Sequence, residues 1–201
     1  MSRLIYLQRW VAAGVVALAC AGQAQAGRTC DEPQDLTPAK VDKSMTLAWK
    51  TLQALDASGA KVVVMARAGQ DLSKYGVRYS HLGFVYRQDT PDGAHVWRVL
   101  HKLNVCGTAE SAIYRQGLGE FFLDDLWQYE AAWVALNPQA EAAMLKVLLD
   151  GPRSLVLHEP RYNMVSYPWS QKYQQSNQWA IETLAFAMTA GSTEPVRSEE
   201  H

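Results

Sequence analysis

A hairpin signal near the middle of the chain constrains the fold more than any other sequence feature. Residues 79–87 and 95–103 are both rich in β-branched and aromatic side chains, and the turn sequence TPDG at 90–93 lies between them. Two strands separated by so short a turn pair in antiparallel fashion. Residues 61–67 (KVVVMAR) and 129–136 predict two more strands. The chain therefore predicts an antiparallel sheet.

Helical segments flank these strands. Thr37-Pro38 is a helix start, and apolar residues then recur at helical spacing (Met45, Ala48, Trp49, Leu52 and Leu55) until Gly59 ends the run. Further helices are expected from Asn137-Pro138 to Leu149 and over 176–190, a short helix over 111–116, and a short strand over 154–157. A sheet packed with helices defines the α+β class.

The first 26 residues resemble an export signal. Arg3 and Arg9 precede an apolar run over 10–21, and Ala24-Gln25-Ala26 has the small-x-small pattern that signal peptidase accepts. The run is too short to cross a bilayer, which needs about 20 residues. We expect a signal peptide (1–26), one α+β domain (27–190) and a polar, disordered tail (191–201), with the protein in the periplasm or secreted. Lipid attachment at Cys20 is the alternative.

Composition excludes several classes of partner. The net charge is −1 and there is no basic run, so we expect no nucleic acid. No later segment is long and apolar enough to span a membrane. His158-Glu159 lacks the second histidine of a helical zinc motif, and neither a Walker loop nor a dinucleotide-binding glycine pattern is present. The sequence predicts no metal and no cofactor.

Two cysteines, Cys30 and Cys106, remain after removal of the signal peptide. In an oxidising compartment two cysteines most often pair, so we expect a Cys30–Cys106 disulfide. The alternative is that Cys106 is a reactive thiol.

One histidine suggests chemistry. His81 lies at the start of the second strand, and alternation along that strand puts it on one face with Gly83 and Val85. An imidazole there is suited to act as a general base. His101 lies one strand later, and either His101 or Asn104 would orient the ring. The alternative is that His81 is an ordinary strand histidine.

A second candidate lies at the start of the last helix. Ser176 would gain there from the helix dipole and from free N–H groups able to stabilise an oxyanion. The alternative is that Ser176 only caps the helix. The loop before it, residues 158–175, is rich in aromatic residues that either stack on a sugar or peptide or fill the core: Tyr162, Tyr167, Trp169 and Tyr173.

The runs YSHLGF, WRVLH and SNQW together resemble the permuted branch of the papain-like NlpC/P60 hydrolases. The resemblance implies a circularly permuted papain-like arrangement in which Ser176 replaces the family cysteine. It makes His81 the base and His101 or Asn104 the third polar residue. It also implies substrates with amide or ester bonds, such as peptidoglycan fragments or lipid acyl groups.

The chain is more closely similar to a bacterial family catalogued as domain of unknown function 2145. The similar stretches are YGVRYSHLGF, NVCGTAESAIYRQGLGEFFLDD and LHEPRYNMVSYPWSQKYQQSNQWAIE. This family implies no established activity.

Four functional hypotheses follow. The protein is a hydrolase or acyltransferase that uses Ser176 and His81, or its chemistry uses other residues, such as Tyr162, His158 or Glu159. Otherwise it is a catalytically inactive binding module or an envelope accessory protein, with residues 121–123 as a docking patch.

Overall fold

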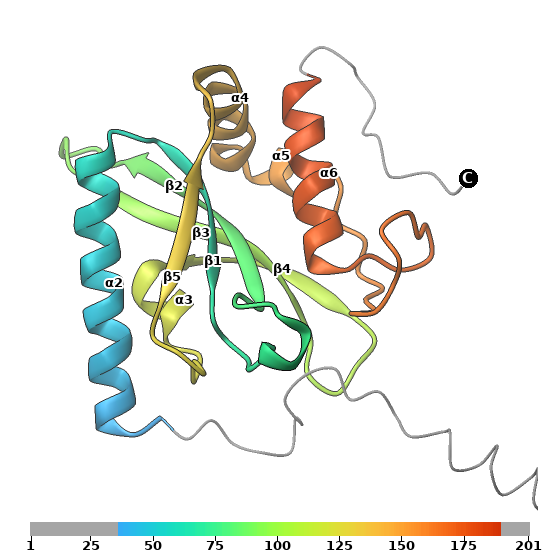
Figure 1. Ribbon diagram of the computed structural model, residues 1–201. Helices are drawn as coiled ribbons and strands as arrows, with labels where there is room; N and C mark the ends of the chain where they lie inside the picture. Colours follow the sequence, from blue (N-terminus) through green and yellow to red (C-terminus); the bar gives the residue numbers. More distant parts are fainter. Residues whose placement is uncertain (1–35, 190–201) are drawn as a thin grey trace, which may run out of the picture. The chain divides into compact units, whose positions relative to one another are not determined.

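The computed structural model describes residues 36–189 as a five-stranded sheet packed with helices (Figure 1). The predicted signal peptide and tail lie outside the described residues. The strand order is β4-β3-β2-β1-β5, and every neighbouring pair is antiparallel. The strands are β1 (Val62–Arg67), β2 (His81–Asp89), β3 (His95–Asn104), β4 (Ser111–Gly117) and β5 (Ala131–Ala135). The α+β class is thus confirmed.

Helix starts follow the capping signals of the sequence. The side chains of Thr37 and Asn137 cap α2 and α4, and a proline follows each cap. Gly59 ends α2 in the left-handed region at φ 72°. The helices are α2 (Pro38–Ser58), η1 (Ser73–Tyr75), α3 (Leu118–Phe122), α4 (Pro138–Leu149), α5 (Gly151–Leu155) and α6 (Ser176–Met188).

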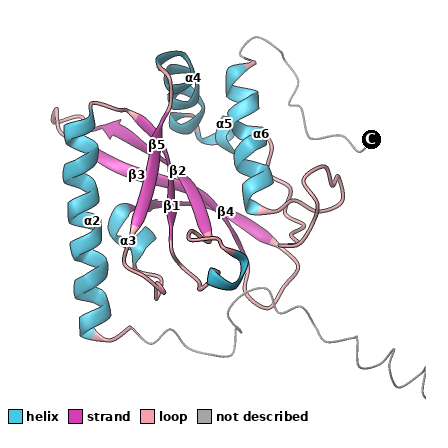
Figure 2. Cartoon of the chain, in the orientation of Figure 1, coloured by secondary structure: helices cyan, strands magenta, loops and turns pink. Residues whose placement is uncertain are grey.

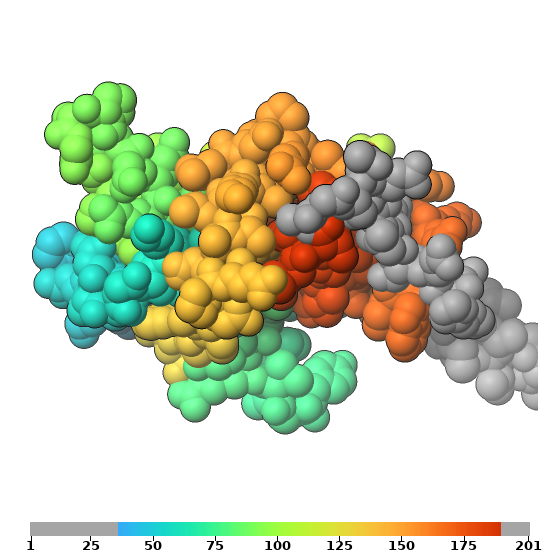
Figure 3. Space-filling model, turned by 90° about the horizontal axis from the view of Figure 1, so that it is seen from above, coloured from blue at the N-terminus to red at the C-terminus, as the bar shows by residue number. Residues whose placement is uncertain are grey.

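Each face of the sheet carries its own hydrophobic core, because successive side chains of a strand point to opposite faces. We call the face covered by α2 and α3 the α2 face; it includes Val85 and Val99. We call the face covered by α4 and α6 the α6 face; it includes Phe84 and Leu100. Figure 2 shows the sheet between these two groups of helices, and Figure 3 shows α4 and α6 side by side.

Helix α2 buries a different stripe from the one its apolar residues predict. Met45 and Trp49 are exposed, whereas Ser44 and Thr51 are buried with Ala48 and Leu55 on the same stripe. The buried stripe of α2 therefore does not follow the hydrophobicity of its residues alone.

Two local predictions were wrong, and one docking hypothesis fails. Residues 111–116 form strand β4, because pairing with β3 overrides their weak helical pattern. Residues 154–157 form no strand; Asp150 caps the short helix α5 instead. Phe121 and Phe122 are fully buried in the core and cannot form an exposed docking patch. Within residues 36–189, no helix combines the length and hydrophobicity that crossing a bilayer requires.

Candidate functional site

The β2–β3 hairpin brings His81 and His101 together, as the hairpin predicts. His81 Nε2 lies 2.8 Å from His101 Nδ1, and both side chains point to the α2 face. Gly83 makes this approach possible. A Cβ on Gly83 would lie 3.0 Å from the Cβ of His101 and 3.1 Å from a methyl of Val99. The glycine in this strand therefore makes room for the histidine of the next one.

A chain of hydrogen bonds continues from His101 and fixes where the protons lie. Gln116 Nε2 donates to the carboxylate of Glu120 at 3.1 Å, so the Gln116 oxygen faces His101 Nε2, 2.7 Å away. An amide oxygen only accepts, so His101 Nε2 carries a proton and its Nδ1 is an acceptor. His81 Nε2 must then donate to His101. It follows that Nδ1 of His81 bears a lone pair.

That lone pair has no hydrogen-bond partner among the described residues. No described residue hydrogen-bonds Nδ1 of His81, and the atom is not among the buried polar atoms that lack a partner in residues 36–189. The half-buried ring is thus held at one nitrogen and presents the other, basic nitrogen to solvent. This is the geometry of an oriented general base.

The surroundings keep both imidazoles neutral. Burial lowers the pKa of His81 well below its ordinary value; the positive charge of Arg67, and then that of His101 when it is protonated, lower it further. Burial is also the main reason that the pKa of His101 falls to about 4; its bond to Gln116 works in the opposite direction. At neutral pH both imidazoles are therefore uncharged, and the lone pair on His81 Nδ1 is available.

Arg67 and Phe121 form the floor of this site. Arg67 is the cross-strand partner of His81, and its guanidinium lies 4.6 Å from the centre of the Phe121 ring. It donates to the Phe121 carbonyl and to Asp124. The Phe121 ring lies 5.2 Å from that of His101 and 6.2 Å from that of His81. Two aromatic contacts thus add to the hydrogen bonds that hold the histidine pair.

Ser176 does not join this site. It is the first residue of α6, and its hydroxyl donates to the main-chain carbonyl of Lys102 at 2.9 Å. Helix α6 covers the α6 face, whereas His81 points to the α2 face, so the sheet separates the two residues. Ser176 does not cap the helix either, since Gln175 holds the N-cap position. Asn104 lies exposed at the end of β3, and His101 takes the orienting position instead.

A buried lysine organises the α6 face. Lys102 is fully buried, and its ammonium contacts Gln174 Oε1 at 2.8 Å, the Glu159 carbonyl at 2.6 Å and His158 Nδ1 at 3.2 Å. Gln174 Nε2 in turn donates to the buried carboxylate of Glu182 at 2.6 Å. No prediction from the sequence included this network. The signal was present, because alternation puts Lys102 on the same face as the core residue Leu100.

The other residues considered for chemistry, His158, Glu159 and Tyr162, lie in or beside the same network. The three acceptors around Lys102 hold it as an ammonium, and His158 Nδ1 is one of them. The Tyr162 hydroxyl lies 3.5 Å from Ser176 Oγ, but no described base contacts either hydroxyl. These residues attach the loop before α6 to the sheet.

The four aromatic residues predicted to bind substrate differ in their exposure. Tyr162 and Tyr173 are half-buried, whereas Tyr167 and Trp169 are exposed.

Cys106 is disulfide-bonded, and its expected partner, Cys30, lies outside the described residues. Within residues 36–189, no cluster of three or more His, Cys, Asp or Glu side chains could hold a metal.

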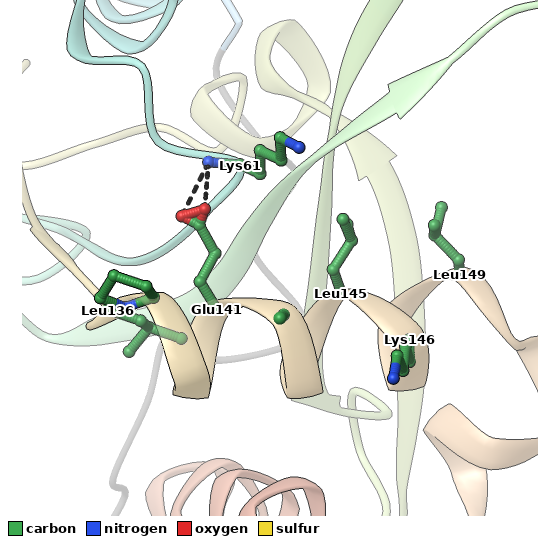
Figure 4. Close-up of a pocket in the computed structure, with 8 residues that line it drawn as sticks. Lys61, Leu136, Glu141, Leu145, Lys146 and Leu149 are labelled. Carbon is green, nitrogen blue, oxygen red and sulfur yellow. Dashed lines mark hydrogen bonds between the residues drawn. The ribbon is translucent and has the colours of Figure 1, made fainter.

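A separate pocket of about 490 Å³ runs along α4 (Figure 4). Leu136, Leu145 and Leu149 line it, and the two carboxylate oxygens of Glu141 share a bifurcated hydrogen bond from the Lys61 N–H. None of the residues of the histidine site contributes to it. The pocket is largely apolar.

Fold and site together define an α+β protein with an open antiparallel sheet and an oriented, neutral histidine pair on one face. The chain belongs to the family described as "uncharacterized protein conserved in bacteria (DUF2145)", whose model matches residues 54–201. Comparison with curated proteins and with solved structures found no match.

Proposed function

We propose that this protein is an exported cell-envelope hydrolase or acyltransferase that acts on amide or ester bonds with His81 as general base. One observation carries the proposal: the hydrogen-bond chain from Glu120 through Gln116 and His101 leaves a lone pair on His81 Nδ1 that faces solvent. Peptidoglycan peptides and acyl esters are the substrate classes that such a base would serve outside the cytoplasm.

In the proposed reaction, His81 Nδ1 takes a proton from water or from an acceptor hydroxyl as its oxygen attacks the carbonyl carbon. The bond to the leaving amine or alkoxide then breaks, and that group receives the proton from Nδ1. His101 and Gln116 keep the ring in place and pass part of the transient positive charge toward Glu120. General base catalysis of this kind contributes about 10²–10⁴-fold to a rate.

Ser176 has no catalytic role in this proposal. A permuted NlpC/P60 arrangement would need Ser176 and His81 on the same face, and α6 packs on the opposite one. The proposal therefore keeps only part of the papain-like division of roles, namely a base and an orienting residue on adjacent strands.

The test compares two alanine variants of the protein purified from bacterial cells, on peptidoglycan peptides and on acyl esters. His81→Ala should abolish turnover, whereas Ser176→Ala should keep it, and a fluorophosphonate probe should leave Ser176 unlabelled. His101→Gln should lower kcat by at least about tenfold, because the ring loses its orientation. Turnover that survives His81→Ala, or that Ser176→Ala abolishes in a folded protein, would refute the proposal.

A specific observation favours a second candidate, a non-catalytic binding module. No hydroxyl or thiol in residues 36–189 hydrogen-bonds His81, so the described chain supplies no nucleophile of its own. In this case the lone pair would accept a hydrogen bond from a bound ligand. The same substrates would then bind, with loss of affinity in His81→Ala, but none would turn over in the wild-type protein.

A further inference from the structure

The imidazole of His158 attaches the loop before α6 to the sheet. We call residues 158–175 the anchored loop; Figure 1 shows it in orange beside the start of α6. His158 Nδ1 lies 3.2 Å from the buried Lys102 ammonium on β3. An ammonium only donates, so Nδ1 accepts and the ring is neutral. The ring also hydrogen-bonds the main chain of Ser111 on β4. His158 therefore holds the loop to two strands while it stays uncharged.

The main chain of the anchored loop continues this attachment along β4. The Ser111 N–H donates to the Pro160 carbonyl at 2.7 Å, and the Tyr162 N–H donates to the Ala109 carbonyl at 2.8 Å. Both bonds lie within four residues of His158. These two amides therefore report whether the start of the loop is attached to the sheet.

A proton on His158 Nδ1 is incompatible with this arrangement. The ring would become a second cation 3.2 Å from the Lys102 ammonium and would no longer offer it an acceptor. Lys102 is fully buried, and Gln174 Oε1 and the Glu159 carbonyl hold its ammonium at 2.8 and 2.6 Å. The His158 ring is only half-buried. The ring is therefore the partner that moves away.

The charges near His158 oppose its protonation. Burial and then the charge of Lys102 lower its pKa below the ordinary value of 6.5, and they outweigh the bond to Ser111 and the charge of Glu159, which raise it. Other charged groups of the surrounding elements have partners of their own or face solvent: Arg161 pairs with Glu159, Glu182 of α6 accepts from two glutamine amides, Arg115 of β4 donates to the Leu148 carbonyl, Arg153 of α5 lies over the Phe186 ring, and Glu110 before β4 is exposed.

We propose that His158 is a pH-sensitive switch: protonation of its ring detaches the start of the anchored loop from β3 and β4. Once detached, the ring regains its ordinary pKa, so the open form binds a proton that the closed form excludes. Opening therefore becomes more favourable as the pH falls below 6.5, and at higher pH the loop stays closed. Release leaves Ser111, at the start of the edge strand β4, without its partner in the loop.

The proposal goes beyond the hydrolase function and does not depend on it. His158 and Lys102 lie on the α6 face, and no residue of the histidine pair takes part.

Hydrogen exchange of the whole chain at pH 7 and at pH 4.5 tests the switch. Protection factors, which correct for the intrinsic effect of pH on exchange, are compared for the Ser111 and Tyr162 amides and for the amides of β1. The two loop-linked amides should lose at least about tenfold in protection relative to β1, the change expected when a hydrogen bond to a charged group is lost. The comparison with β1 separates local release from global unfolding.

Two variants identify the group that titrates. His158→Asn keeps an acceptor near the position of Nδ1 but takes up no proton, so its relative protection should be the same at both pH values. His95→Asn is the matched control, because His95 is also half-buried and bonded to a charged side chain, Asp56, but lies at the other end of β3. This variant should respond to pH like the wild type.

Either of two exchange results would overturn the proposal. One is equal relative protection at both pH values in the wild type. The other is the same loss in His158→Asn, which would assign the acid response to the carboxylates of Glu159 or Glu182. Circular dichroism at both pH values verifies that each variant is folded. An NMR titration of His158 in the wild type is an independent check, and a pKa of 6.5 or above would also overturn the proposal.

Discussion

The Ser176 hydroxyl donates to the Lys102 carbonyl, and this bond joins the start of α6 to β3. Ser176→Ala should lower the free energy of unfolding by about 1 kcal/mol, the usual net value of one hydrogen bond. Urea unfolding measures this loss, and the exposed neighbour Asn177→Ala serves as control. A variant with unchanged stability would show that the bond contributes nothing.

Substitution in the Lys102 network should lower the free energy of unfolding far more. Lys102→Met keeps the length of the side chain but removes its charged amino group. Gln174 Oε1 then loses its donor, and the buried Glu182 carboxylate, which Gln174 contacts, loses the nearby positive charge. We expect a loss of about 3 kcal/mol, as when one partner of a buried charged pair is removed. Lys146→Met, on the exposed side of α4, should change stability by less than about 0.5 kcal/mol. Similar effects of the two substitutions would contradict this prediction.

Gly83→Ala tests the close approach of the two strands. The added methyl would lie 3.0 Å from His101 Cβ, with Val99 and the Leu100 carbonyl also close, so the sheet must shift. Stability should fall by about 1–3 kcal/mol, as for overpacking elsewhere. Gly151→Ala, where a Cβ meets nothing within 4 Å, is the control. If both variants unfold at the same urea concentration, the steric argument is wrong.

The histidine pair predicts a specific dependence of stability on pH. The pKa of His101 is about 4 in the folded protein, below the ordinary value of 6.5. The unfolded chain therefore binds the proton more readily, and the free energy of unfolding decreases as pH falls from 6.5 to 4. The slope for one such histidine is about 1.4 kcal/mol per pH unit. His101→Gln should reduce the slope in denaturant titrations; an unchanged slope would rule out His101 as its source.

The tautomers can be measured directly. Nitrogen NMR at pH 7 should show His81 protonated at Nε2 and unprotonated at Nδ1. Glu120→Ala should give a mixture of the two His81 tautomers, because Gln116 then loses the acceptor that sets the orientation of its amide. Asp150→Ala, at the cap of α5, is a control with no link to the pair. A wild-type spectrum with the proton on Nδ1 would reverse the proposed direction of proton transfer.

Local signals in the sequence predicted most elements because each depends on neighbouring residues. Thr37 and Gly59 set the ends of α2, and the turn at 90–93 sets the β2–β3 hairpin. Strand β4 was mistaken for a helix because its own residues carry only a weak pattern, and their conformation is decided by pairing with β3. Helix α5 was missed because its start depends on the cap at Asp150, which the glycine and proline after it obscured.

The sequence by itself determined that His81 and His101 meet, since a hairpin of fixed register puts Gly83 opposite His101 and leaves the rings on one face. Only the tertiary structure decided which helix covers that face. Alternation along a strand assigns side chains to two faces, but it does not say on which of them a helix 70 or more residues away will pack. That choice separated Ser176 from His81 and gave Lys102 its buried partners.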